Sequence, residues 1–229
     1  PERRAARLRV VPAFRASRAS HVGTYAITGG LGGLGLRAAA LLAERGAISV
    51  ILASRGGRVA RGDQSLEAQL HGLRASTVVA TCDSSDMGDL LALACSGRSL
   101  TGVLHAAGTG DKGLVVELAA HRVHWMYAPK AFGAWYLHSI MPRAPLEAHV
   151  LFSSVGSGLG NVGQGNYAAA NACLDALAKC RRAQGAYATS VDWGPWAEVG
   201  MASGGAVNSR MKAMGLGLID AWQGIAALQ

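Results

Sequence analysis

The sequence has no uninterrupted apolar run of the roughly 18 residues that a membrane-spanning helix requires. The nearest candidate, GLGGLGLRAAALLAERGAISVILAS at residues 30–54, is broken by charged residues and by glycines. Only 16% of the residues are charged and half are hydrophobic, so the 229 residues can bury a sizeable core. These properties exclude a membrane span and predict one soluble domain, cytoplasmic in location.

Metal-ligand and phosphate-loop signatures are also missing. The cysteines, Cys82, Cys95, Cys173 and Cys180, show neither CxxC nor metal-ligand spacing. We therefore expect buried thiols in a reducing compartment and no metal site. No GxxxxGK[ST] motif occurs, which excludes a P-loop nucleoside triphosphatase.

Acidic residues are scarce at the start of the chain. Residues 1–22 carry six arginines against Glu2 alone, so the rest of the chain holds only three of the eight net positive charges. This uneven distribution argues against a general nucleic-acid-binding protein. The segment is rich in arginine and serine, as transit peptides are, yet it does not begin with methionine. We predict a basic extension or linker at residues 1–22, or part of a plastid transit peptide.

Short apolar runs alternate with helical stretches from residue 23 onward. We predict strands over residues 24–28, 48–54, 76–81, 101–108, 148–154 and 188–193, and helices over about 33–45, 63–73, 85–95, 114–141 and 164–184. Asp63 is the expected N-cap of the second helix, and Pro129 is expected to interrupt the fourth. The alternation predicts an α/β fold with a doubly wound parallel sheet and helices on both faces. Because the chain ends in the amphipathic segment DAWQGIAALQ, we expect the last strand of such a sheet to be missing.

The sequence TGGLGGLG follows the first predicted strand and leads into the first predicted helix. Glycines there let the backbone approach a pyrophosphate closely, and the helix N-terminus offers free N–H groups and a positive dipole end. Glycine clusters also occur in ordinary tight turns. The position of this one in a β-α-β unit favours a nucleotide site.

No acidic residue ends the second predicted strand, ILASR, where an NAD-dependent protein usually holds the ribose 2′-hydroxyl. Arg55 stands there instead, and a guanidinium can bind the 2′-phosphate of NADP. The alternative is a solvated loop arginine. Asp83 follows the third strand, where a carboxylate can accept a hydrogen bond from the adenine amino group, and the small residues of HAAG (105–108) end the fourth. We predict NADPH as the cofactor.

Seven motifs, in order, resemble the ketoreductase domain of modular polyketide synthases, a branch of the short-chain dehydrogenase/reductases. They are TYAITGGLGGLG, LASR, CDSSD, GVLHAAG, PKAFGAWYLH, LFSSVGSGLGNVGQGNYAAANACLDALA and VDWGPWAEVGM, spanning about residues 23–201. The reductase domain of animal-type fatty acid synthases is similar. The resemblance implies a Rossmann-like, NADPH-binding catalytic domain over residues 23–229.

The resemblance also carries over the catalytic residues one by one. Tyr167 matches the catalytic tyrosine, Ser154 the serine 13 residues before it, and Asn171 the asparagine four residues after it. Other short-chain reductases have a lysine at that last position, whereas this family supplies the lysine from an earlier helix, where Lys130 stands in PKAFGA. The implied roles are proton donation by Tyr167, carbonyl orientation by Ser154, and ribose binding with pKa tuning by Lys130. Asn171 would steady the lysine or a relay water.

The resemblance further places a cofactor along the glycine loop and the carboxyl ends of the strands. Trp193 and Trp196 would roof its nicotinamide end beside the Pro195 main chain, or they are ordinary hydrophobic anchors. Residues 199–211 resemble the mobile lid that grips the substrate. The expected cofactor-binding residues are Thr28, Gly29, Gly30, Gly32, Gly33, Leu34, Gly35, Ser54, Arg55, Asp83, Ser84, His105, Ala106, Ala107, Gly108, Lys130, Tyr167, Trp193, Gly194 and Pro195.

The implied activity is NADPH-dependent reduction of a β-ketoacyl thioester to its β-hydroxyacyl form in polyketide or fatty acid biosynthesis. The substrate would be carried on an acyl carrier protein, and other synthase domains would be partners. A catalytically silent or epimerising domain and a reductase of free small ketones stay open as alternatives. Lys112 replaces the second aspartate of the family's LDD motif, and Leu159 replaces the tryptophan that marks the opposite product type. The configuration of the alcohol is therefore not predicted.

Overall fold

The computed structural model describes residues 22–59, 65–142, 144–197 and 217–228, together with residues 213 and 215. Within them, six strands form one parallel sheet in the order β3-β2-β1-β4-β5-β6. The strands are β1 Thr24–Thr28, β2 Ser49–Ser54, β3 Ser76–Thr81, β4 Gly102–His105, β5 Ala148–Ser154 and β6 Thr189–Trp193. The predicted doubly wound parallel sheet is thus confirmed.

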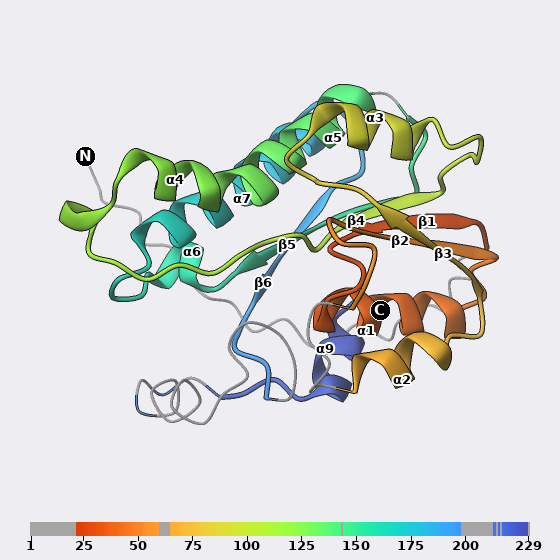
Figure 1. Cartoon of the computed structure of the whole chain (residues 1–229), viewed down its shortest axis with the longest axis horizontal. Helices are drawn as coiled ribbons and strands as arrows, with labels where there is room; N and C mark the ends of the chain where they lie inside the picture. Colours follow the sequence, from red (N-terminus) through yellow and green to blue (C-terminus); the bar gives the residue numbers. More distant parts are fainter. Residues whose placement is uncertain are drawn as a thin grey trace.

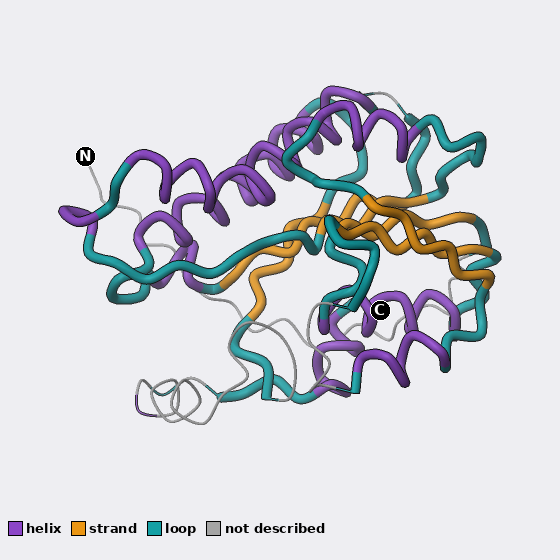
Figure 2. The backbone as a smooth tube through the Cα atoms, in the orientation of Figure 1, coloured by secondary structure: helices purple, strands orange, loops and turns teal. Residues whose placement is uncertain are grey.

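Helices cover both faces of the sheet (Figures 1 and 2). One face carries α1 Gly33–Glu44, α2 Leu66–His71 and α9 Ala221–Ala227. The other carries α3 Met87–Ala94, α4 Ala120–Tyr127, α5 Gly133–Ile140 and α7 Gly165–Ala183, and the short α6, Gly156–Leu159, follows β5. None of the helices in the described residues is both long enough and apolar enough to cross a membrane.

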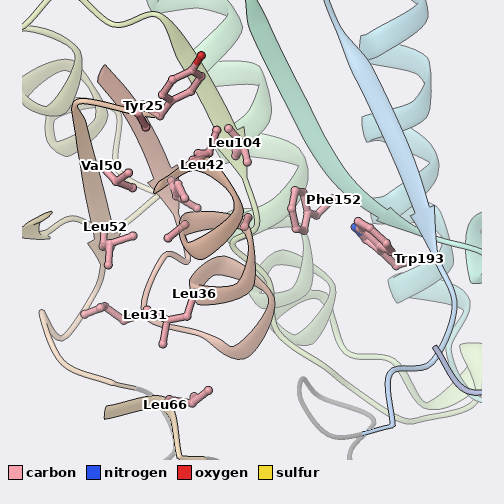
Figure 3. Packing of buried hydrophobic residues seen from close by; sticks show 14 of the residues in the cluster. Tyr25, Leu31, Leu36, Leu42, Val50, Leu52, Leu66, Leu104, Phe152 and Trp193 are labelled. Carbon is pink, nitrogen blue, oxygen red and sulfur yellow. The ribbon is translucent and has the colours of Figure 1, made fainter. Parts of the chain in front are cut away.

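The central strands bury both of their faces. Along β1, Tyr25 and Ile27 join the core beneath α1, whereas Ala26 between them joins the core beneath α3 and α5. Successive side chains of a strand point to opposite faces, so a strand covered on both sides must be apolar throughout. Figure 3 shows the larger of these cores, in which Leu36 of α1 and Phe152 of β5 are also buried.

The strand order places the glycine-rich loop after β1 at a topological switch point of the sheet. From β1 the chain winds outward through β2 to β3, and it then returns to β4 on the opposite side of β1. The connections that leave the carboxyl ends of β1 and β4 diverge to opposite faces, which creates a crevice where such sheets bind ligands. The loop after β1 and the segment after β4 both start there.

The predicted helix over 114–141 is wrong in its first part. Residues 115–117 form one 3₁₀ turn, and the α-helical region begins only at Ala120. The reason is tertiary, because the segment before α4 crosses to the loop that precedes α7, where the Gly113 N–H donates to the Gly163 carbonyl over 2.9 Å. This bond to a distant loop holds the segment outside a continuous helix.

Other boundaries differ by smaller amounts. The second helix, expected from Asp63, begins at Leu66 after Ser65, and Asp63 lies outside the described residues. The fourth strand ends at His105, which leaves the small residues 106–108 in the loop. The predicted basic segment over 1–22, apart from its last residue, and the expected lid over 199–211 also lie outside the described residues. The expectation of buried thiols is wrong for three cysteines, because Cys82 is buried whereas Cys95, Cys173 and Cys180 are exposed.

Candidate active site

The glycine loop between β1 and α1 is packed backbone against backbone. A Cβ on Gly29, whose φ is +67°, would lie 2.7 Å from the Ala106 carbonyl oxygen, and one on Gly35 would lie 2.4 Å from the Gly29 oxygen. A Cβ on Gly30 would lie 2.7 Å from the Ile27 oxygen. Side chains would therefore push the loop out of this position, so glycine is required at these positions of the loop, which we call the glycine cradle.

The N-terminus of α1 opens onto this cradle. Its N-cap, Gly32, offers no side chain to the first-turn N–H groups, and no acidic residue occurs in that turn. The Gly33, Leu34 and Gly35 amides therefore lie at the positive end of a helix of 12 residues. This donor set fits the pyrophosphate of a dinucleotide.

Residues expected near the adenosine half of a cofactor surround the carboxyl ends of β2 and β3. Ser54 ends β2, and its buried Oγ has no hydrogen-bond partner among the described residues. Arg55, next in the chain, is exposed. The Asp83 carboxylate accepts from the Ser85 N–H and hydroxyl, over 2.9 and 2.6 Å. Among the described residues, the carboxyl end of β2 thus offers an unpaired hydroxyl followed by an exposed guanidinium, a group that can pair with a phosphate.

Lys130 lies in a π-helical turn, Ala128–Phe132, between α4 and α5. Pro129 has no N–H and its ring crowds the preceding turn, so a regular α-helix is disfavoured there. The expected interruption near Pro129 is this wider turn, which keeps the chain helical on both sides. Such turns re-aim side chains and recur at functional sites.

The Lys130 side chain lies in the protein interior and is only 4% exposed. Gly108 makes room for it, since a Cβ there would lie 2.9 Å from Lys130 Cε. Its Nζ donates to the Phe152 carbonyl over 2.8 Å and lies 5.7 Å from the centre of the Tyr167 ring. Burial lowers the pKa of Lys130 from its usual value to about 8, although Asp175 opposes the shift. The ammonium thus remains the major form at neutral pH.

Ser154 and Tyr167 face each other across Gly156. The position of a Cβ on Gly156 is 3.4 Å from Ser154 Oγ and 3.9 Å from Tyr167 Cε1. Ser154 ends β5, and its Oγ accepts from the Gly156 N–H, so its own hydroxyl hydrogen is available to a ligand. Tyr167 lies in the first turn of α7 and is half-buried. The structure brings Lys130, Ser154 and Tyr167 together from three separate elements.

Asn171 is fully buried one turn beyond Tyr167 on α7. Its Nδ2 donates to the Tyr167 carbonyl over 2.8 Å, while its Oδ1 has no hydrogen-bond partner among the described residues. A buried acceptor without a donor is costly, so the site suits a bound water or a ligand hydroxyl.

Three predicted cofactor contacts have side chains already engaged within the protein. Thr28 Oγ1 lies 2.7 Å from His105 Nδ1, and His105 Nε2 lies 2.9 Å from the Lys130 carbonyl oxygen. Ser84 Oγ donates to the Pro129 carbonyl over 3.2 Å. These side chains support the turn that carries Lys130.

The two tryptophans pack as hydrophobic anchors in this structure. Trp193 lies between the rings of Phe152 and Trp196, with centroids 5.6 and 5.2 Å away. Trp196 covers Gly224 of α9, where any Cβ would overlap its ring. The Pro195 carbonyl accepts from the Ile219 N–H, and the Cβ position of Gly194 is 3.2 Å from Ile219. The indole N–H groups of both rings are buried without a partner among the described residues, and a role of the rings at the nicotinamide end stays a prediction.

A profile of the KR domain family matches residues 23–198. The chain belongs to this family, the ketoreductase domains of polyketide synthases. Members are oxidoreductases, and the fold and the motif order described above agree with that assignment.

Curated relatives of this ketoreductase domain are much longer proteins. The chain is 46% identical over 187 residues to "Polyketide synthase GfsA" of Streptomyces halstedii, covering 80% of this chain and 2% of the relative. It is 42% identical over 209 residues to "Erythronolide synthase EryA2" of Saccharopolyspora erythraea, covering 90% of this chain and 6% of the relative. The chain thus spans only a small part of each.

Solved structures agree with this ketoreductase fold. A structure of A-type ketoreductases from a modular polyketide synthase superposes with a TM-score of 0.88 at 39% identity, covering 96% of this chain and 47% of that one. The first ketoreductase of the tylosin polyketide synthase gives 0.84 at 40%, with 96% and 48% covered. A short-chain dehydrogenase/reductase from Serratia marcescens, 19% identical with a TM-score of 0.72, shares the fold; 90% of this chain and 88% of that one are covered.

Sequence reasoning missed several groups of this ketoreductase that border the site. The Asp111 carboxylate pairs with Arg122 and accepts from Asn166 Nδ2 over 3.0 Å, which ties the segment after β4 to the residue before Tyr167. An asparagine directly preceding the tyrosine in an Ala-rich helix was an available signal. The Phe152 carbonyl that accepts from Lys130 is a main-chain group, so the residue type at position 152 gives no sign of this contact.

Proposed function

We propose that this domain uses NADPH to reduce the β-keto group of an acyl thioester to a hydroxyl group. The observation that carries the proposal is the convergence of Lys130, Ser154 and Tyr167 beside a glycine cradle at the switch point of the sheet. A glycine cradle at a helix N-terminus and a proton donor at the same switch point suit a cofactor-dependent reduction of a carbonyl group.

NADPH supplies the hydride when bound, and this chain's residues would hold it by three features. The α1 N-terminus and the glycine cradle would receive the pyrophosphate. Arg55 would bind the 2′-phosphate, with the unpaired Ser54 hydroxyl nearby. Lys130 would donate to the nicotinamide ribose with the N–H bonds that Phe152 does not use.

During reduction the ketone oxygen gains negative charge, and two hydroxyl groups are arranged to meet it. Ser154 would donate a hydrogen bond that orients the carbonyl and supports the developing charge. Tyr167 would hold the proton at its Oη and transfer it to that oxygen. The nearby Lys130 ammonium favours the phenolate that results, and the open Asn171 Oδ1 would bind a water that replaces the proton.

The substrate carrier follows from the relatives. Each of the two synthases named above contains a stretch similar to this chain within a much longer polypeptide. We propose that the thioester is presented on an acyl carrier protein and that other polyketide synthase domains flank this one. Linking domain and carrier raises the local substrate concentration, so a weak encounter suffices.

The decisive test follows NADPH absorbance with a β-ketoacyl thioester mimic, for the wild-type chain and for Tyr167→Phe. Loss of the phenol should lower kcat by about 10²- to 10⁴-fold while NADPH still binds. Equal consumption by both proteins would refute the role of Tyr167. No consumption by the wild type would favour a catalytically silent or epimerising domain.

A second arm compares a carrier-bound thioester with a free small ketone. A higher kcat/KM for the carrier-bound substrate is expected. Turnover of the ketone with no gain from the carrier would favour a reductase of free ketones.

A further inference from the structure

A buried histidine joins the two strands at the switch point to the turn that carries Lys130. Thr28 and His105 are the last residues of β1 and β4, and they are partners in the parallel register. Both side chains are almost fully buried. His105 contacts Thr28 Oγ1 with one ring nitrogen and the Lys130 carbonyl with the other, over 2.7 and 2.9 Å.

The partners decide which ring nitrogen carries the hydrogen. A carbonyl oxygen only accepts, so His105 Nε2 must donate to Lys130. Complete burial lowers the pKa of His105 to about 4, so the ring is neutral near pH 7 and carries one hydrogen only. His105 Nδ1 is therefore bare and accepts from the Thr28 hydroxyl.

The π turn has little freedom once these bonds are made. Within the turn, the Pro129 carbonyl accepts from Ser84 Oγ, and the Lys130 carbonyl accepts from His105 Nε2. Gly133, which follows the turn, fits closely, since its Cβ position is 2.6 Å from the Ser84 oxygen and 3.0 Å from His105 Cε1. The charged or titratable groups that act on His105 are Lys130 and, on β5, His149.

We propose that His105, in the Nε2–H tautomer that the Lys130 carbonyl requires and with Nδ1 accepting from Thr28, is a positioning residue that fixes the backbone of the π turn and thereby aims the Lys130 ammonium. The inference rests on the proposed function, in which Lys130 serves the reduction. His105 itself touches neither substrate nor reacting atoms. It acts through the main chain of Lys130, at the opposite end of that residue from the Nζ bond to Phe152.

Two amide variants separate the bond to Lys130 from mere filling of space. The amide nitrogen of glutamine reaches about as far as His Nε2, so His105→Gln keeps a donor for the Lys130 carbonyl. The shorter His105→Asn does not reach it. We expect kcat to fall about 10- to 100-fold in His105→Asn, because small misplacements of a catalytic group have effects of this size. His105→Gln should recover most of that loss.

His149→Asn is the matched control. His149 is also buried, on the neighbouring strand β5, and neither of its ring nitrogens has a partner among the described residues. A structural effect alone would affect both asparagine variants alike. In His105→Asn only, water reaching Lys130 should move the alkaline limb of the kcat/KM profile to higher pH.

A direct measurement needs no activity. Nitrogen-15 NMR of the full chain with labelled histidine should show His105 protonated at Nε2 and bare at Nδ1. An Nδ1–H tautomer would overturn the proposal, as would a His105→Gln variant as impaired as His105→Asn, or matching pH profiles for His105→Asn and His149→Asn. A wild-type chain without NADPH turnover but with the expected tautomer would refute the proposed function and leave the geometry of His105 standing.

Discussion

The glycine loop and the catalytic group meet in one crevice, yet they are built in different ways. In the loop, Gly35 is constrained by the nearby main chain of Gly29 and Gly30, whereas Gly29 itself lies against the main chain of Ala106 and Ala107. In the catalytic group, Lys130 and Tyr167 stand 37 residues apart in the chain and approach through β5 and α7. The contrast teaches that a glycine loop can be recognised within one short stretch of sequence, whereas this proton-transfer site combines residues from elements far apart in the chain.

The largest test of the catalytic half is Lys130→Met, which keeps most of the side chain and removes the ammonium. We expect kcat to fall about 100-fold, as for loss of a group that assists proton transfer. The measurement is NADPH consumption with a β-ketoacyl thioester mimic. Lys179→Met, at an exposed position of α7, is the control and should behave as the wild type. A loss of less than about threefold would contradict the role of Lys130.

The same variant tests how strongly the fold constrains this lysine. Burial lowers the pKa of Lys130 to about 8 in the folded chain, below its value in the unfolded chain. Between these two pKa values the unfolded chain binds more protons, so the wild type gains stability as pH rises through that window. Urea unfolding at about pH 7.5 and about pH 9.5 should show the wild type gaining about 2 kcal/mol relative to Lys130→Met. An unchanged difference would mean that the lysine is not desolvated.

Gly35→Ala tests the loop half. A methyl group there would lie 2.4 Å from the Gly29 oxygen and 2.7 Å from Gly30 Cα, and neither main-chain atom can rotate away. We expect the Kd for NADPH to rise about tenfold, the size of a typical overpacking cost. Fluorescence titration of NADPH measures it. Gly217→Ala, where a Cβ would meet nothing within 4 Å, should leave binding unaltered.

Arg55→Ala addresses cofactor choice at the edge of the loop half. Because the guanidinium is exposed, we expect its loss to reduce the preference for NADPH over NADH by only about fivefold. Arg74→Ala removes the same charge from an exposed loop before β3, at the amino ends of the strands. It should not alter the preference for NADPH over NADH. An unchanged preference for NADPH in Arg55→Ala would mean that Arg55 is an ordinary solvated loop arginine.

The smallest effect is expected where the segment after β4 is tied to the start of α7. Arg122 pairs with Asp111, and the hydrogen bond from Arg122 is the main reason that the pKa of the Asp111 carboxyl group is lowered. Since the pair is partly exposed, Arg122→Ala should lower the free energy of unfolding by less than about 1 kcal/mol. Release of the segment beside Asn166 should raise KM about twofold, an effect of well under 1 kcal/mol. Arg98→Ala, which loses a bond to Ser49 at the other end of β2, should leave KM unaltered.

Much of the fold was predictable because its signals are local. The strands at 24–28 and 148–154 have the predicted bounds, since apolar runs of that length suit a sheet covered on both faces. The edge strand at 76–81 also has the predicted bounds, although it is partly exposed. The helix predicted from residue 114 failed because Gly113 bonds to Gly163, far along the chain. Helical periodicity contains no information about such a partner.

The candidate site was predictable to a similar extent. Motif order pointed to Lys130, Ser154 and Tyr167, and the structure brings all three together. Motif order could not indicate that Thr28, Ser84 and His105 use their side chains to hold the π turn. A residue type shows which hydrogen bonds are possible, and only the packed neighbours decide which one forms.

The sequence by itself determined the alternation of strands and helices, the glycine cradle after β1 and the identity of the groups available for proton transfer. Local backbone preferences and apolar periodicity carry that information within a few residues. Only the tertiary structure decided that Lys130 would be buried against the Phe152 carbonyl, and that the Lys130 carbonyl would accept from His105. These contacts join residues up to 25 positions apart, and their energies depend on burial, which exists only in the packed chain.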